Sequence, residues 1–177
     1  SLDYLYGNEA VIHQLAGAIV KSGESLKAQL GVGTRDTTRL SVGFRTAYNA
    51  WLRGDAAAAE ASLRPLREHY AAPAFAGRLD ESPNLPFWLT GVIAAGRKDQ
   101  PRLREMTARL EEKVVKNGVN ATNYFPIYKF LLHLKALQAS LAGDSAGLLA
   151  GVEEAERFRK KMGYWSSPFH LPYFLTE

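Results

Sequence analysis

The chain has 177 residues, of which 46% are hydrophobic and 23% charged, and this size and composition indicate one folded domain spanning residues 1–177. It lacks cysteine, which excludes disulfides and thiolate zinc sites. It also has no apolar run near the ~20 residues that cross a bilayer and no signal-peptide pattern at Ser1–Tyr4, so we expect a cytoplasmic protein without a membrane partner. The net charge is +4, but acidic residues interrupt the basic stretches, which argues against a nucleic-acid partner.

Helical patterns begin near the start of the chain. Apolar residues at helical spacing predict a helix over residues 8–30, with a stripe formed by Val11, Ile12, Leu15, Ala18 and Ile19. A second helix over residues 36–53 is expected to bury Leu40, Phe44, Ala47, Tyr48 and Trp51. A third follows Asp55, and Pro65 is expected to kink or split it because proline lacks an N–H donor.

The second half continues the helical pattern after a Pro- and Gly-rich loop at residues 71–84. A short, nearly all-apolar helix over 86–96 should be buried on most sides. Asp99 should cap the next helix, which is expected to end at Asn117–Gly118. Two more helices are expected, from about 123 to 142 and from 145 to about 161. The sequence shows no alternating apolar pattern that would predict a strand. The sequence therefore predicts an all-α fold.

Three inter-helix turns resemble one another, and each places an aspartate before a helix, at Asp55, Asp99 and Asp144. These aspartates are 44 and 45 residues apart. The positions four, eight and eleven residues after each are Ala59, Leu63 and Leu66; Leu103, Thr107 and Leu110; and Leu148, Val152 and Ala155. Such a repeat is typical of antiparallel helix hairpins stacked as a short, tetratricopeptide-like α-α superhelix. Ordinary helical bundles also use this turn chemistry, so the bundle stays an alternative.

The sequence offers no catalytic constellation. The four histidines are far apart, and metal-binding, phosphate-loop and nucleophile-elbow motifs are lacking, so we expect no metal, no cofactor and no enzyme activity. His133 is interpreted as a tolerated neighbour of an apolar stripe. The glutamates at 111–112 and 153–156 are interpreted as members of charged helix faces that pair with nearby lysine and arginine.

Aromatic residues gather near the end of the chain. The tail, residues 163–177, is expected to pack as a cap over the last hairpin, and an exposed aromatic surface is the alternative. Tyr124 and Tyr128 share a helix face that, with Lys129, could line a groove.

The stretch from Pro86 to Asp99, a Trp- and Leu-rich helix that runs into an Arg-Lys-Asp turn, resembles helical bacterial toxin-immunity proteins of polymorphic-toxin and contact-dependent growth inhibition systems. The Tyr-bearing helix from Tyr124 to the second Gly-Asp turn at Asp144 is similar to the same family, and the resemblance covers about residues 40–160. It implies a cytoplasmic protein, monomeric or in a 1:1 complex, that neutralises a cognate toxin domain by occluding its active site or substrate surface. The alternative is a tetratricopeptide-like adaptor or the sensor domain of a regulator.

Candidate partner-binding residues combine the aromatic groups with a local acidic face. They are Tyr124, Tyr128, Lys129, Glu153, Glu154, Glu156, Tyr164 and Trp165.

Overall fold

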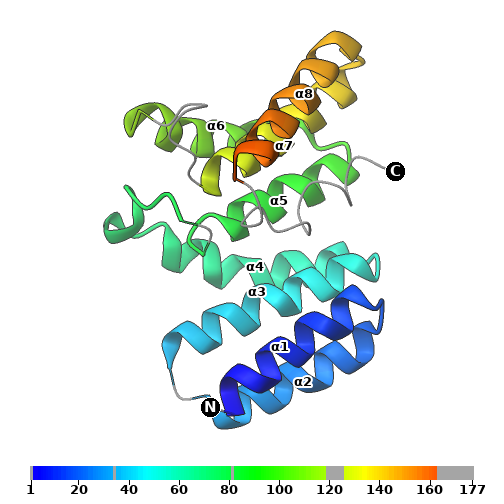
Figure 1. The fold of residues 1–177 in the computed structure, drawn as a ribbon, viewed down its shortest axis with the longest axis vertical. Coiled ribbons are helices and arrows are strands. Elements are labelled where there is room, and N and C mark those ends of the chain that lie inside the picture. Colours follow the sequence, from blue (N-terminus) through cyan, green and yellow to red (C-terminus); the bar gives the residue numbers. More distant parts are fainter. Residues whose placement is uncertain (1, 34, 81, 119–125, 163–177) are drawn as a thin grey trace. The chain divides into compact units, whose positions relative to one another are not determined.

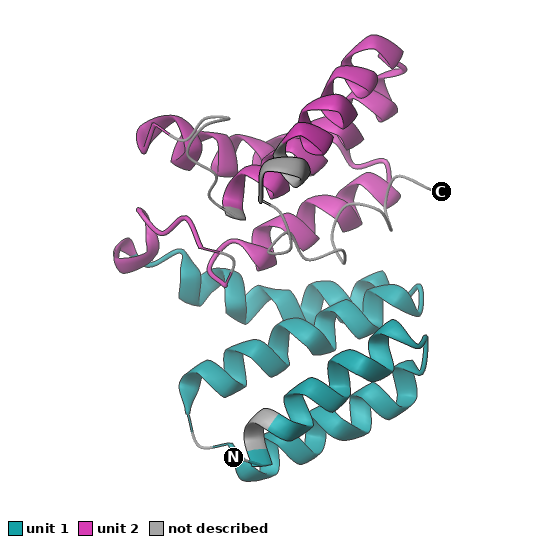
Figure 2. Ribbon diagram, viewed as in Figure 1, with its two compact units in different colours: residues 1–72 teal, residues 73–177 magenta. Residues whose placement is uncertain are grey.

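The structure, a computed structural model, describes residues 2–33, 35–80, 82–118 and 126–162 (Figure 1). These residues form eight α-helices and one short 3-10 helix, and they contain no strand. The all-α prediction is confirmed. The chain divides into two compact units, residues 1–72 and 73–177, coloured separately in Figure 2. The tail predicted to act as a cap, 163–177, lies outside the described residues.

Unit 1 consists of two helix hairpins. Its helices are α1 (Leu2–Leu15), α2 (Ile19–Val32), α3 (Asp36–Leu52) and α4 (Ala56–Tyr70). The helix α1 packs along α2, α3 packs along α4, and α2 joins the two hairpins by packing on α3. Consecutive helices therefore lie side by side within this unit, as predicted for a hairpin stack.

Unit 2 repeats the hairpin arrangement after a 3-10 turn at Pro73–Phe75. Its helices are α5 (Leu85–Gly96), α6 (Gln100–Lys116), α7 (Pro126–Ala142) and α8 (Ser145–Met162). The helix α7 packs on α5, α6 and α8. Every residue from 86 to 95 is buried, which confirms the prediction for the apolar helix. A Cβ on Gly91 would lie 2.8 Å from the methyl groups of Leu134, so a larger residue here would require the Leu134 side chain to shift.

The first hairpin corrects the sequence prediction. Instead of one helix over 8–30, the chain turns at residues 16–18, where Gly17 adopts a left-handed backbone with φ 70°. Ile12 and Leu15, predicted to be buried, are 62% and 42% exposed. The apolar stripe predicted for this segment combines residues of two antiparallel helices, so these residues do not share one helix face.

One turn geometry closes all four hairpins. The residue with positive φ is Gly17, Gly54, Lys98 or Gly143. The N–H of the next residue then donates to the carbonyl five positions back: Ala18 to His13 at 2.8 Å, Asp55 to Ala50 at 2.9 Å, Asp99 to Ala94 at 2.8 Å and Asp144 to Ala139 at 2.9 Å. The predicted repeat of three turns is confirmed, and the structure adds a fourth turn at the first hairpin.

The stripe that follows each turn is also confirmed. In α4 and α6, the positions four, eight and eleven residues after the aspartate are all buried. In α8, Ala155 is buried, whereas Leu148 and Val152 are half-buried. The equivalent residues of α2 are Ser22, Leu26 and Gln29, and all three are buried.

The structure contradicts two expectations, the burial predicted for most of the α3 residues and a split of α4 at Pro65. Of the residues predicted to be buried in α3, only Ala47 is; Phe44, Tyr48 and Trp51 form a half-buried row in which Tyr48 lies 6.2 Å from Phe44 and 5.4 Å from Trp51, measured between ring centroids. The helix α4 runs unbroken through Pro65. Ala61, whose carbonyl loses its helical donor there, is exposed, so water can satisfy this group.

The side chain at the cap position distinguishes the first turn from the others. Asp55, Asp99 and Asp144 accept hydrogen bonds from the backbone N–H groups of Ala58, Arg102 and Gly147, at 2.9, 3.1 and 2.9 Å. Ala18 has backbone dihedrals close to those of Asp55 but no side-chain oxygen.

We therefore predict that Ala18→Asp stabilises the protein by about 0.5–2 kcal/mol, since the carboxylate would accept a free N–H at the start of α2. Urea denaturation followed by circular dichroism measures the change. The matched variant Asp55→Ala should lose a similar amount. A destabilised Ala18→Asp variant would contradict the equivalence of the turns.

Lys98 is the residue other than glycine that takes positive φ in these turns, at φ 58°. An L-residue in this conformation is strained by about 1 kcal/mol, because its Cβ crowds the carbonyl. Lys98→Gly is therefore expected to raise the free energy of unfolding by about that amount. Gly54→Ala, at the equivalent position with φ 78°, should lower it. Equal stabilities for Lys98→Gly and the parent would contradict the prediction.

Candidate functional site

The candidate partner-binding residues that the structure describes lie on α7 and α8. Tyr128 and Lys129 stand at the start of α7, and Glu153, Glu154 and Glu156 lie on α8. Tyr124, Tyr164 and Trp165 lie outside the described residues.

Glu154 connects the two helices of this hairpin. The hydroxyl of Tyr128 donates to Glu154 Oε1 at 3.2 Å, and Arg157 Nε donates to Glu154 Oε2 at 2.8 Å. The Glu154 side chain is 21% exposed, whereas that of Arg157 is 69% exposed. The contact with Arg157 confirms the charge pairing predicted for this helix. The carboxylate therefore fixes an aromatic ring and a guanidinium at the edge of the same surface.

The other candidates divide between surface and interior. Glu153 and Glu156 are exposed on α8. Lys129 is only 6% exposed, and its Nζ lies 5.2 Å from the ring centroid of Phe130. The structure thus joins Tyr128 to Glu154 but does not bring Lys129 to the exposed acidic surface.

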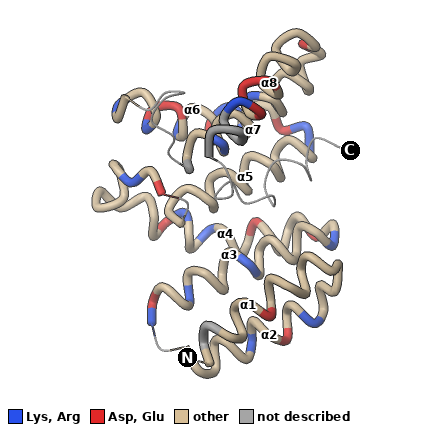
Figure 3. The backbone as a smooth tube through the Cα atoms, in the orientation of Figure 1, with Lys and Arg blue, Asp and Glu red and all other residues tan. Residues whose placement is uncertain are grey.

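Charges of both signs alternate along the helices. Figure 3 shows Lys or Arg segments interleaved with Asp or Glu segments on α6 and α8. Arg102 pairs with Glu105 on α6, and Lys135 of α7 pairs with Glu111 of α6. The described residues thus follow the mixed-charge pattern of the sequence.

His133 is not the peripheral neighbour that the sequence suggested. It is 3% exposed, and its Nδ1 accepts a hydrogen bond from Trp88 Nε1 at 2.9 Å. Because Nδ1 is the acceptor, the imidazole that makes this bond is neutral and carries its proton on Nε2. The ring also lies 5.8 Å from the indole of Trp88, so it is a polar member of the unit 2 core.

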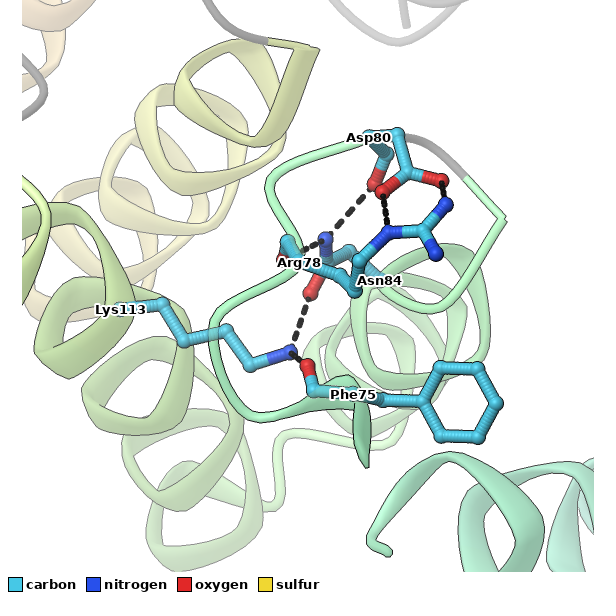
Figure 4. Close-up of polar contacts among 5 residues, drawn as sticks. All are labelled: Phe75, Arg78, Asp80, Asn84 and Lys113. Atoms are coloured by element: carbon cyan, nitrogen blue, oxygen red, sulfur yellow. Dashed lines mark hydrogen bonds and ion pairs between the residues drawn. The ribbon is translucent and has the colours of Figure 1, made fainter. Parts of the chain in front are cut away.

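Lys113 forms a second buried polar group that the sequence placed on a charged surface. Its ammonium donates to Asn84 Oδ1 at 2.9 Å and to the carbonyl of Phe75 at 3.2 Å (Figure 4). Asn84 Nδ2 donates in turn to the carbonyls of Arg78 and Asp80, at 3.1 and 2.7 Å. Asn84 is fully buried and Lys113 is 7% exposed. This group fastens the loop before α5 to the last turn of α6.

The electrostatics of this group have identifiable causes. Burial lowers the pKa of Lys113, and the nearby Arg109 guanidinium lowers it further. Hydrogen bonds from Arg78 Nε, at 2.8 Å, and from its terminal nitrogen, at 2.9 Å, lower the pKa of Asp80. The stability that Asp80 contributes is thus present above its ordinary pKa of 3.8 and is lost as the pH falls through the lowered value.

The described ranges contain no group of three or more side chains suited to hold a metal ion. Within the same ranges, no helix combines the length and apolar character of a membrane span. The buried polar groups of unit 2 bond chiefly to one another and to the backbone, an arrangement that stabilises a fold. The exposed surface of α7 and α8 is therefore the candidate functional site.

Comparison with protein-family models, curated proteins and solved structures gives no match to this chain.

Proposed function

We propose that this chain is a protein-binding module, an immunity protein that neutralises a cognate bacterial toxin domain by occluding its active site or substrate surface. The observation that carries the proposal is the contact of Glu154 with Tyr128 and Arg157, which holds two side chains of interface type, a tyrosine and an arginine, in place across one hairpin. The resemblance of residues 40–160 to helical immunity proteins supports the identity of the partner.

The arrangement suits recognition of a protein surface. Tyrosine and arginine are enriched at the energetic centres of interfaces, and side chains ordered before binding lose less entropy on association. Glu153 and Glu156, both exposed, add negative charge beside this contact. Their charge would favour a basic patch on the toxin and would speed encounter.

The direct test is co-expression. The full chain is expressed with a toxin domain encoded next to it, and growth is followed with and without the chain. Rescue of growth together with a 1:1 complex in gel filtration is the expected result. A toxin that kills equally in the presence of the chain, or a chain that lies beside no toxin gene, would overturn the proposal.

Interface variants locate the binding surface. Tyr128→Phe removes the hydroxyl donor to Glu154, and Glu154→Gln replaces one of the two acceptor oxygens by an NH2 group and removes the charge. Because each variant breaks one of the two hydrogen bonds that order Tyr128 and Arg157, we expect toxin binding to weaken about 5- to 30-fold, measured by calorimetry, with little change in melting temperature. The matched control is Glu105→Gln, since Glu105 pairs with Arg102 at the same i, i+3 spacing on α6. Equal weakening by the control would place the interface elsewhere.

The alternative function is a tetratricopeptide-like adaptor or regulator sensor domain, which the repeated hairpin turn also supports. Such a protein would bind a regulatory or client protein and would leave toxin toxicity unchanged in the co-expression assay.

A further inference from the structure

Three cations line the edge of α6 that contacts α5 and the loop before it. Arg102, Arg109 and Lys113 are spaced seven and four residues apart, so they share one side of the helix. Arg102 pairs with Glu105. Within the described ranges, no carboxylate forms an ion pair with Arg109 or Lys113. This edge of unit 2 therefore carries two cations that have no ion-pair partner there.

Arg109 is held against α5 by an aromatic ring. The central carbon of its guanidinium lies 4.1 Å from the centroid of the Phe87 ring, and Phe87 is 3% exposed. In the described part of the chain, the half-buried Arg109 has a buried Nε without a hydrogen-bond partner. The ring and the burial of Nε leave the terminal nitrogens as the part of the guanidinium that an acceptor can reach.

Lys113 adds a second positive charge one helical turn away. Both hydrogen bonds of its ammonium go to neutral oxygens. Asp80 attracts it at longer range, but Figure 4 shows this carboxylate bound to Arg78. Among the described residues, Lys113 and the charged groups around it comprise three cations and one carboxylate, an excess of two positive charges. Like charges four residues apart on a helix repel each other, so an anion beside Arg109 would relieve this repulsion.

We propose that Arg109 binds a carboxylate, the side chain of an aspartate or glutamate of the protein partner, beside Lys113. A guanidinium presents a planar pair of terminal nitrogens that matches the two oxygens of a carboxylate, and the nearby ammonium in its desolvated site strengthens the attraction. The inference rests on the proposed function for the source of the carboxylate, whereas the anion site itself does not depend on that function. The partner would then place an acidic residue here and a basic patch against Glu153 and Glu156.

Acetate, a free carboxylate, tests the site in the full chain. Sodium acetate replaces sodium chloride at constant ionic strength, and NMR follows the Nε–H signals of the arginines. We expect the Arg109 signal to saturate at a concentration at least about fivefold lower than that of Arg104, an exposed arginine on another side of α6. The pKa of Lys113 should rise in acetate, because a nearby anion favours the charged ammonium, and Arg109→Gln should abolish this response.

The variant Arg109→Lys separates recognition by a planar pair of donors from recognition by charge alone. Lysine keeps the charge but lacks the planar pair, so the acetate concentration needed to raise the pKa of Lys113 should increase about fivefold. Equal acetate responses at Arg109 and Arg104 would overturn the proposal. A response to inorganic phosphate without one to acetate would also overturn it and would indicate a phosphate-bearing ligand.

The toxin domain tests the source of the carboxylate. In calorimetry with the full chain, Arg109→Gln should weaken toxin binding about tenfold, and the matched control Arg104→Gln should leave it unchanged. Toxin binding that does not respond to Arg109→Gln overturns the assignment of the carboxylate to this partner. A toxin that does not bind the parent chain overturns the proposed function instead, and the acetate titration then decides by itself whether the anion site exists.

Discussion

Replacement of Trp88 by alanine is expected to lower the free energy of unfolding of unit 2 by about 3–5 kcal/mol. Trp88 is 1% exposed in the first turn of α5, and its indole lies 5.4 Å from the ring of Phe130. The substitution removes this packing and leaves a cavity, and it also removes the donor to His133 Nδ1. Urea denaturation followed by circular dichroism measures the loss.

Two further variants separate packing from hydrogen bonding. Trp88→Phe keeps an aromatic ring but leaves His133 Nδ1 without the indole donor, so a loss of about 1–3 kcal/mol is expected. Trp51→Ala should cost less than Trp88→Ala, because Trp51 is only half-buried. From the sequence, both tryptophans were expected to be buried. Equal losses for the two alanine variants would show that the burial of Trp88 does not control the stability of unit 2.

The sequence predicted most of the hairpins because their turns and stripes are local patterns. Three helix caps were predicted from the aspartates at 55, 99 and 144. The buried helix faces were predicted from the apolar residues that follow each of them. The first hairpin has the same backbone turn but lacks these signals, since alanine stands at the cap and two of the three buried positions in α2 are Ser22 and Gln29. Counting the period of 44 or 45 residues back from Asp55 gives residues 10–11, whereas the turn lies at residues 16–18, so the period did not indicate this hairpin either.

The buried polar contacts could not be predicted from the sequence in the same way. Trp88 and His133 are 45 residues apart, and Lys113 and Asn84 are 29 apart. A lysine on a helix with alternating charges has the same local pattern whether its side chain reaches water or a buried carbonyl. Only the packing of the loop against α6 decides between these outcomes. Charge pairing on α8, by contrast, was predicted from helical spacing, although the pair that forms is Glu154–Arg157 at i, i+3 rather than one at i, i+4.

Lys113 is expected to be the second large contributor to the stability of unit 2. Lys113→Met removes the donor to Asn84 Oδ1 and to the Phe75 carbonyl, which leaves the first acceptor in a buried site and the second in a half-buried one. We expect a loss of about 2–4 kcal/mol in the free energy of unfolding at neutral pH. Lys116→Met, at an exposed lysine near the end of the same helix, is the matched control and should change stability by less than about 0.5 kcal/mol.

The pH dependence of the stability difference between the parent and Lys113→Met provides a sharper test. Because burial lowers the pKa of Lys113 in the folded protein, the unfolded chain holds more protons between the lowered value and the ordinary 10.5. Unfolding therefore becomes less favourable as the pH rises through this window, while neutral Lys113 still has N–H groups to donate. The stability of the parent relative to Lys113→Met should thus increase as the pH rises towards 10.5, and the Lys116→Met difference should stay flat. A Lys113→Met difference that shrinks over this range would mean that the ammonium is not held in a desolvated site.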